Sequence, residues 1–318
     1  MRRLLPVLAL TIGLAACGGQ EPAAPAEPAA PAAPAAAEPE ATSLLGAPLV
    51  PIALDNREAL EADLKAAQDE LAAHPDSADA LIWVGRRQGY LWQYREAIDT
   101  FTKGIERFPD DARFYRHRGH RYITVRKFDE AIADFEKATT LIAGQPDEVE
   151  PDGQPNAQNK PRSTLQSNIW YHLGLAYYLK ADYANARRAY DECLKVSKND
   201  DMLVATSDWQ WMTLKRLGDE AAAAAVLERI QPEMDIIENA SYHKRLLMYK
   251  GELTPESLLD TNNADDLTIA TQGYGVGNYY FVNGNQSKAR EIFERVVDGA
   301  YWAAFGYIAA EADLARMR

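Results

Sequence analysis

Five alanines recur along the chain at a nearly constant spacing: Ala97, Ala131, Ala186, Ala221 and Ala289. Ala97 and Ala131 are 34 residues apart, Ala186 and Ala221 are 35 apart, and Ala221 and Ala289 are 68 apart, which is two periods. The step from Ala131 to Ala186 is 55, one period plus an insertion of 21 residues. This regularity predicts a repeated structural unit, because chance apolar periodicity loses phase within a few turns.

Residues 167–199 show the unit most clearly. Trp170 and Gly174 share one side of a first predicted helix, and Ala186 and Tyr190 follow one side of a second. This order of small and large apolar residues resembles the tetratricopeptide repeat (TPR), a helix–turn–helix unit of 34 residues. The resemblance implies an all-α fold, a right-handed superhelical α-solenoid of about six repeats with a capping helix at each end.

The repeat register divides the chain into seven parts. We expect a signal peptide at 1–16, a lipidated Pro/Ala-rich tether at 17–43, an N-terminal cap at 44–77, repeats 1 and 2 at 78–144, a Pro-rich acidic insertion loop at 145–164, repeats 3 to 6 at 165–299, and a C-terminal capping helix at 300–318.

Three of these parts carry more detailed predictions. In the N-terminal cap, 44–54 should lie extended against the first helices, and a helix should cover 57–73 with Asn56 as its N-cap. Repeat 5 is degenerate, with helices predicted at 236–250 and 255–259. The closing helix is predicted at 301–316, where it would cover the last apolar face of the solenoid.

The first residues resemble a bacterial lipoprotein signal. Two arginines precede an apolar stretch at 4–14, and Leu-Ala-Ala then leads directly to Cys17. The resemblance implies that the chain is cleaved before Cys17, which receives a diacylglycerol and an N-acyl chain, enough for stable anchoring. Gly18 stands where an inner-membrane retention signal has Asp, which favours the outer membrane, facing the periplasm. The alternative is an ordinary secretory signal and an unlipidated periplasmic protein.

Composition limits the partners of the chain. Residues 20–41 are almost only Pro, Ala and Glu, which predicts a polyproline II tether rather than a helix. The net charge of −13 argues against nucleic acid and against a basic patch on anionic lipid, so membrane contact is expected through the lipid anchor only.

Few residues resemble a catalytic or metal site. The chain has no Cys/His or Ser/His/Asp arrangement in a known motif, so we predict no enzyme, no cofactor and no metal. His117 and His120 lie three residues apart and could share a metal, but neighbouring arginines favour a basic surface patch. Calcium binding by the acidic loop 145–164 is the other metal hypothesis, although its spacing differs from the twelve-residue calcium loop. Cys193 is predicted to be a buried structural thiol.

In TPR arrays the first helices line a concave groove, and the resemblance carries this expectation over to residues of this chain. The predicted groove residues, which we expect to contact other envelope proteins or peptides, are Ile82, Arg86, Tyr90, Arg113, Arg116, His120, Asn168, Tyr171, Tyr178, Lys244, Tyr274 and Asn278. The first two repeats are locally basic, so an acidic peptide should be steered there. Ile82 and Arg86 replace the Lys and Asn of the chaperone-binding carboxylate clamp, so that activity is not predicted.

The lipoprotein signal together with the repeats resembles the NlpI type of bacterial TPR lipoprotein. The C-terminal order of a shortened repeat (249–260), a regular repeat and a lone helix adds to this resemblance. It implies a homodimeric adaptor that recruits cell-wall hydrolases or a periplasmic protease. A pilotin-like assembly factor for a pilus or outer-membrane machine is one alternative, and a periplasmic solute-binding or enzymatic protein is another.

Overall fold

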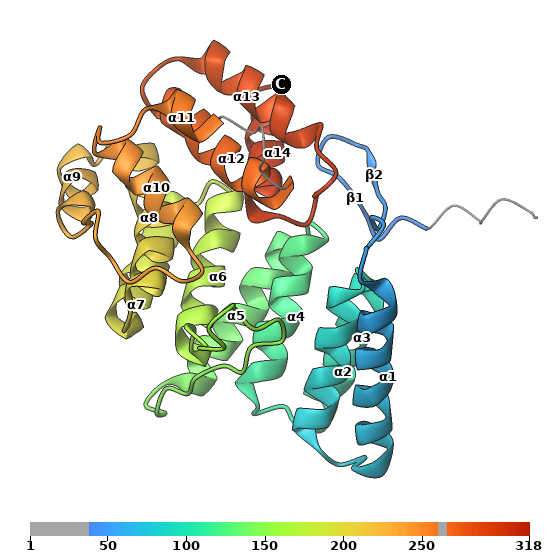
Figure 1. The fold of residues 1–318 in the computed structure, drawn as a ribbon. Coiled ribbons are helices and arrows are strands. Elements are labelled where there is room, and N and C mark those ends of the chain that lie inside the picture. Colours follow the sequence, from blue (N-terminus) through green and yellow to red (C-terminus); the bar gives the residue numbers. More distant parts are fainter. Residues whose placement is uncertain (1–37, 260–265) are drawn as a thin grey trace, which may run out of the picture. The chain divides into compact units, whose positions relative to one another are not determined.

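The computed structural model describes residues 38–259 and 266–318. In these residues the chain forms two short antiparallel strands, β1 (Ala41–Thr42) and β2 (Pro48–Leu49), followed by helices (Figure 1). The helices are α1 (Arg57–Ala73), α2 (Ala78–Tyr90), α3 (Tyr94–Arg107), α4 (Ala112–Thr124), α5 (Phe128–Ile142), α6 (Leu165–Leu179), α7 (Tyr183–Val196), α8 (Asp200–Leu217), α9 (Glu220–Glu228), α10 (Ala240–Tyr249), α11 (Pro255–Leu259), α12 (Asp266–Val282), α13 (Gln286–Val297) and α14 (Phe305–Arg316).

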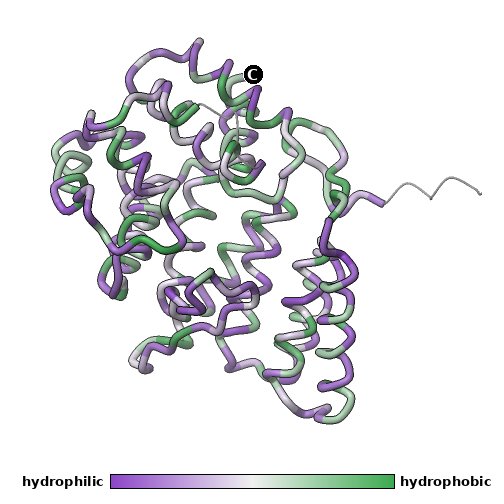
Figure 2. The backbone as a smooth tube through the Cα atoms, viewed as in Figure 1, coloured by the Kyte–Doolittle hydropathy of each residue, from purple (hydrophilic) through white to green (hydrophobic). Residues whose placement is uncertain are grey.

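The helices form an all-α solenoid of antiparallel pairs, as predicted. From α1 to α9 each helix packs against the next one in sequence, and α10, α12, α13 and α14 continue the array. Figure 2 shows hydrophobic and hydrophilic stretches alternating along most of these helices, as expected where one face packs on a neighbour. None of the helices in the described residues is long and apolar enough to cross a membrane.

A glycine on the first helix of four pairs lies directly against an aromatic ring on the second. A Cβ atom on that glycine would lie within 2.5 to 2.9 Å of the ring, so only glycine permits the close crossing. The pairs are Gly85 with Phe101, Gly119 with Phe135, Gly174 with Tyr190, and Gly277 with Phe293. The recurrent alanines Ala97, Ala131, Ala186 and Ala289 are fully buried on the second helices. Ala221 is exposed, and Ala223 is the buried alanine of α9, so the alanine spacing marks where paired helices meet in repeats 1, 2, 3 and 6 and is two residues off in repeat 4.

Each of the six corners within a helix pair passes through one residue in the left-handed backbone region. These residues are Trp92 (φ 63°), Arg126 (66°), Ala181 (62°), Gly218 (74°), Gly251 (82°) and Gly284 (86°). The left-handed conformation costs roughly 1 kcal/mol for residues other than glycine. The degenerate repeat 5 shares this corner through Gly251, so its turn is regular even though its second helix is short.

Three sequence predictions about helix starts need correction. Asn56 occupies the N-cap position of α1 but its side chain makes no capping hydrogen bond. The helix predicted at 236–250 begins only at Ala240. The backbone amides of 237–239 instead donate to the buried carboxylate of Asp201, at 2.8–3.2 Å, which satisfies the helix end from outside.

The helix predicted at 301–316 begins at Phe305, because the residues before it form a turn that joins both ends of the described chain. In this turn the Trp302 ring lies 5.0 Å from that of Trp92, centroid to centroid, and its Nε1 donates to the Val50 carbonyl at 2.6 Å. Residues 44–54 were predicted to lie extended against the first helices. They also contact the C-terminal end of the array, where the Leu44 amide donates to Glu311 of α14.

Candidate ligand-binding face

The predicted groove residues fall into two sets in the structure. The C-terminal set, Tyr178, Tyr274 and Asn278, is fully buried. The hydroxyls of Tyr178 and Tyr274 are 2.7 Å apart, Tyr178 donates to Asn278 at 3.2 Å, and Tyr274 donates to Asp313 of α14 at 3.1 Å. These side chains face the core, contrary to the predicted groove exposure, because α12 and α14 pack over this part of the array.

Two further predicted positions differ in their surroundings. Tyr171 is buried on α6, and its hydroxyl donates to Tyr242 of α10 at 3.2 Å. Tyr171 is thus also turned away from solvent, contrary to prediction. Lys244 is exposed on α10. The described residues therefore form no open groove along the length of the solenoid, and the remaining predicted residues, at the N-terminal end, lie beneath or beside the insertion loop.

The insertion loop lies over a second, N-terminal set of predicted residues, which includes Arg86, Tyr90, Arg116 and Asn168. Arg116 and Glu150 form an ion pair with 2.9 Å between Nε and Oε2, and Asn168 donates to the same carboxylate at 3.0 Å. Arg86 donates to the Pro151 carbonyl at 2.8 Å, and a Cβ on Gly153 would lie 1.9 Å from the Tyr90 hydroxyl. The acidic loop thus occupies the surface where the sequence predicted an acidic peptide.

The remaining residues of this set lie beside the loop. Ile82 is buried on α2, and together with Arg113 it lines a hollow of about 200 Å³ against Glu148, Val149 and Pro151. Arg113 donates to Asp111 and pairs with Asp79, so much of its charge is already balanced. The exposed Val149 side chain, 61% accessible, lies at this edge.

The loop is fixed at its base rather than loosely draped. Val149 and Thr164 form a β-bridge, the Glu150 amide donates to the Ser163 carbonyl at 3.0 Å, and the Leu165 amide donates to the Glu148 backbone carbonyl at 2.8 Å. Next to this base, Arg162 ties the loop to repeat 4, because its Nε donates to Asp201 at 2.8 Å. These contacts set the position of Glu150.

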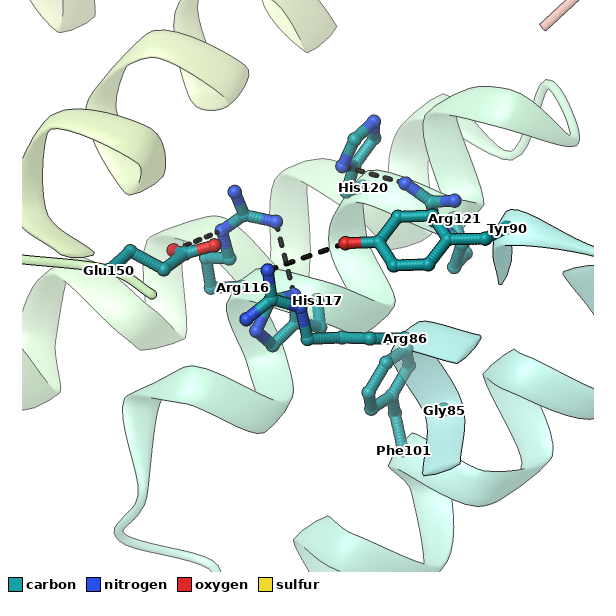
Figure 3. Close-up of a pocket in the computed structure, with 9 residues that line it drawn as sticks. All are labelled: Gly85, Arg86, Tyr90, Phe101, Arg116, His117, His120, Arg121 and Glu150. Carbon is teal, nitrogen blue, oxygen red and sulfur yellow. Dashed lines mark hydrogen bonds and ion pairs between the residues drawn. The ribbon is translucent and has the colours of Figure 1, made fainter. Parts of the chain in front are cut away.

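Beneath the loop is a small cavity of about 120 Å³ between α2 and α4 (Figure 3). Its lining combines three guanidinium groups, two imidazoles and a phenol with a single carboxylate, that of Glu150. The lining residues are Gly85, Arg86, Tyr90, Phe101, Arg116, His117, His120, Arg121 and Glu150. The cavity is therefore strongly cationic within an acidic protein.

Both histidines in the cavity accept hydrogen bonds from arginines. Arg116 lies 3.1 Å from His117 Nδ1, and Arg121 lies 2.8 Å from His120 Nδ1. Because arginine only donates, each Nδ1 must be unprotonated. Burial, followed by the adjacent guanidinium, lowers the pKa of both imidazoles well below its ordinary value. Among the described residues no cluster of three metal-ligating side chains forms.

A third histidine, His172 of α6, packs against His120 with ring centroids 4.6 Å apart and ring planes tilted by 38°. Its Nδ1 lies 2.6 Å from the Asn168 carbonyl and donates to it. Burial lowers the pKa of His172 to about 3, and the charge of Arg116 adds to the effect. The floor of this region is thus neutral imidazole, and its positive charge comes from arginine alone.

Cys193 is buried on α7, with its Sγ 3.2 Å from the Thr206 hydroxyl. Burial raises the pKa of this thiol to about 11. The predicted lipidation site, Cys17, lies outside the described residues, as do the signal peptide and most of the tether.

Comparison with known proteins identifies the repeat. The family model for the tetratricopeptide repeat matches residues 112–144 and 167–200, which are the α4–α5 and α6–α7 pairs. The chain contains tetratricopeptide repeats. The matched TPR segments flank the insertion loop on both sides, so the loop interrupts a repeat array rather than joining two different domains.

Several solved TPR structures are similar to the chain. One is YrrB, described as a TPR protein with an unusual peptide-binding site, at 16% identity over 74% of this chain and 92% of that chain, with a TM-score of 0.42. Another is a TPR protein from Parabacteroides merdae ATCC 43184, at 17% identity over 80% and 90%, with a TM-score of 0.47. No curated protein is significantly similar to the chain in sequence.

Of the charged residues that line the cavity in this TPR array, two were not among the predicted site residues, Arg121 and Glu150. Arg121 lies over Gly89 of α2, where a Cβ would be 2.8 Å from its Nη1. A small residue at the position of Gly89 is the only local signal for this contact. Glu150 is one of four acidic residues between 147 and 152, and its sequence neighbours do not distinguish it from the others.

Proposed function

We propose that this TPR protein is a scaffold anchored to the outer membrane that holds protein partners in the periplasm. The anchor is supported by the lipoprotein-like sequence ending at Cys17 and by the Pro/Ala-rich tether that follows. The scaffold role is supported by the TPR array itself, whose repeats serve as supports for protein contacts.

The observation that carries the partner class is the cationic face of α2 and α4 in an acidic protein. Arg86 and Arg116 on this face already hold an acidic, proline-rich segment, namely the chain's own loop, through a carboxylate and a carbonyl. We propose that partners present an acidic extended segment to the same face, with Trp83 and Tyr90 as aromatic anchors beside the arginines. The NlpI-type resemblance suggests a cell-wall hydrolase or a periplasmic protease as the partner, and a homodimer as the adaptor.

The partner proposal is tested with the full-length chain in non-ionic detergent and purified envelope hydrolases and proteases of the same cell. Arg86→Glu should weaken binding by about tenfold or more, because a charge that faces the partner is reversed. Arg188→Glu on α7, an exposed arginine away from the loop, is the matched control and should bind normally. Equal binding by both variants would rule out this face. Binding to secretins or barrel proteins alone would favour an assembly factor.

The anchor is tested separately by growing cells with a labelled fatty acid. Label should appear on the wild-type chain and be absent from Cys17→Ala. An unlabelled wild-type chain would show that the protein is not a lipoprotein, whatever the outcome of the partner experiment.

A further inference from the structure

The cavity beneath the insertion loop is lined by more positive than negative charge. One further carboxylate, Asp152 of the loop, lies close by: burial raises its pKa, and the nearby charge of Arg86 opposes this rise. Three guanidinium groups line it, and Glu150 supplies the single carboxylate (Figure 3). That carboxylate is committed to Arg116, at 2.9 Å, and to Asn168. Among the described residues, Arg86 and Arg121 have no carboxylate within ion-pair distance.

The contacts of these two arginines are to neutral groups. Arg86 donates to the Pro151 carbonyl and lies 3.4 Å from the Tyr90 hydroxyl. Arg121 donates to the neutral His120 and lies over the Tyr94 ring at 5.4 Å. Burial lowers the pKa of Arg121, an indication that its charge is poorly solvated. Both side chains are partly exposed and neither has a carboxylate partner, so an added anion would gain charge-assisted hydrogen bonds there.

We propose that this cavity binds a small oxyanion, a carboxylate or a phosphate, between the guanidinium groups of Arg86 and Arg121 and beside the Arg116–Glu150 pair. Guanidinium groups bind both anions in a fork of two hydrogen bonds. The volume of about 120 Å³ is enough for several waters or one such ion. Glu150 is then a neighbouring negative charge that the ligand must tolerate or displace.

The ligand has two sources that share this chemistry. A free ion could diffuse in beside the loop, or a partner protein could insert an aspartate or glutamate side chain. The inference does not rest on the scaffold function: phosphate can bind where no partner is found, and a partner can bind elsewhere on the array if the cavity stays empty.

The test is isothermal titration of the full-length chain, in non-ionic detergent and at ionic strength held constant with sodium chloride. The probes are inorganic phosphate, succinate, a ten-residue glutamate peptide and a ten-residue glutamine peptide. Arg86→Met and Arg121→Met should each weaken binding about tenfold or more, because each removes a charged hydrogen bond. Arg188→Met is the control, and circular dichroism verifies that each variant is folded.

The Glu150→Gln variant distinguishes anion binding in the cavity from a loss of binding caused by a disturbed fold. Removing the competing charge while keeping the shape should strengthen phosphate or succinate binding about tenfold. Binding of phosphate or succinate points to a free ion, and binding of the glutamate peptide alone points to a partner's side chain; either result supports the site. No binding by any probe, equal binding of the glutamine peptide, or wild-type affinity in the three cavity variants would overturn it.

Discussion

Arg126, at the corner between α4 and α5, is paired with Glu311 of α14, which lies 185 residues further along the chain. Their Nη2 and Oε2 atoms are 2.6 Å apart, and both side chains are almost completely buried. Arg126 also donates to the Trp302 carbonyl at 3.0 Å. This pair therefore joins repeat 2 to the C-terminal capping helix.

The Glu311→Ala variant should lose about 3–5 kcal/mol of unfolding free energy, because it leaves Arg126 buried without its partner. Urea unfolding followed by circular dichroism measures the loss. Glu294→Ala, at an exposed position on α13, should change the unfolding free energy by less than about 0.5 kcal/mol. The double variant Arg126→Met with Glu311→Leu should regain most of the loss. A Glu311→Ala variant as stable as the control would mean that the pair does not stabilise the fold.

The Gly85→Ala variant should destabilise the fold by about 1–3 kcal/mol, because its Cβ would lie 2.5 Å from the Phe101 ring. Differential scanning calorimetry provides the measurement. Adding Phe101→Leu should recover part of the loss by making room. If the double variant is no more stable than Gly85→Ala alone, the loss of stability comes from helix propensity or backbone effects and not from crowding against the Phe101 ring.

Stability should fall as the pH drops below about 6.5, because the pKa of His172 is lowered to about 3 in the folded chain. Between about pH 6.5 and about pH 3, His172 is protonated in the unfolded state and neutral in the folded state. The free energy of unfolding therefore decreases by up to about 1.4 kcal/mol for each unit by which the pH falls. Urea titrations between pH 7 and 5 would show a shallower dependence in His172→Phe. An identical slope in both proteins would mean that His172 is protonated in the fold.

Cys193 should react very slowly with a thiol reagent in the native protein, because its pKa is raised to about 11. The thiolate fraction at mildly alkaline pH is then about a hundredfold lower than for an unperturbed thiol, and burial hinders access as well. If Cys17 is lipidated, the mature protein has no fast-reacting thiol, and one thiol appears on unfolding. A fast-reacting native thiol that persists in Cys17→Ser would assign the reactivity to Cys193.

The repeat register could be predicted from sequence because it rests on local pairs. Gly174 and Tyr190, for example, lie within one unit, and the same small and large residues return in the next. The late start of α10 could not be predicted, because its cause is the carboxylate of Asp201, more than a full repeat earlier in the chain. The amphipathic pattern of a helix gives no sign that a carboxylate far away in the sequence accepts hydrogen bonds from the amides at its N-terminus.

The candidate site shows the same division. The basic character of α2 and α4 could be predicted from the arginines themselves, but their occupancy by the loop could not. Glu150 reaches Arg116 across a connection with no periodic pattern, and α14 covers Tyr274 through a contact with Asp313 that is equally distant from the repeat signal. The prediction that Tyr178, Tyr274 and Asn278 face a groove was wrong, because contacts between distant parts of the chain bury these side chains.

The corners of the solenoid carry a consequence for its evolution and redesign. Trp92 and Arg126 keep a left-handed backbone that glycine would adopt without strain, yet their side chains are the ones that reach Trp302 and Glu311. A consensus-based redesign that placed glycine at both positions would relieve two strained turns. It would also remove the contacts of Trp92 with Trp302 and of Arg126 with Glu311, which hold the C-terminal helix against the array. At both positions a strained backbone is retained together with a side-chain contact to the C-terminal end of the array. A glycine that is favourable for the turn alone would therefore be unfavourable for the whole fold.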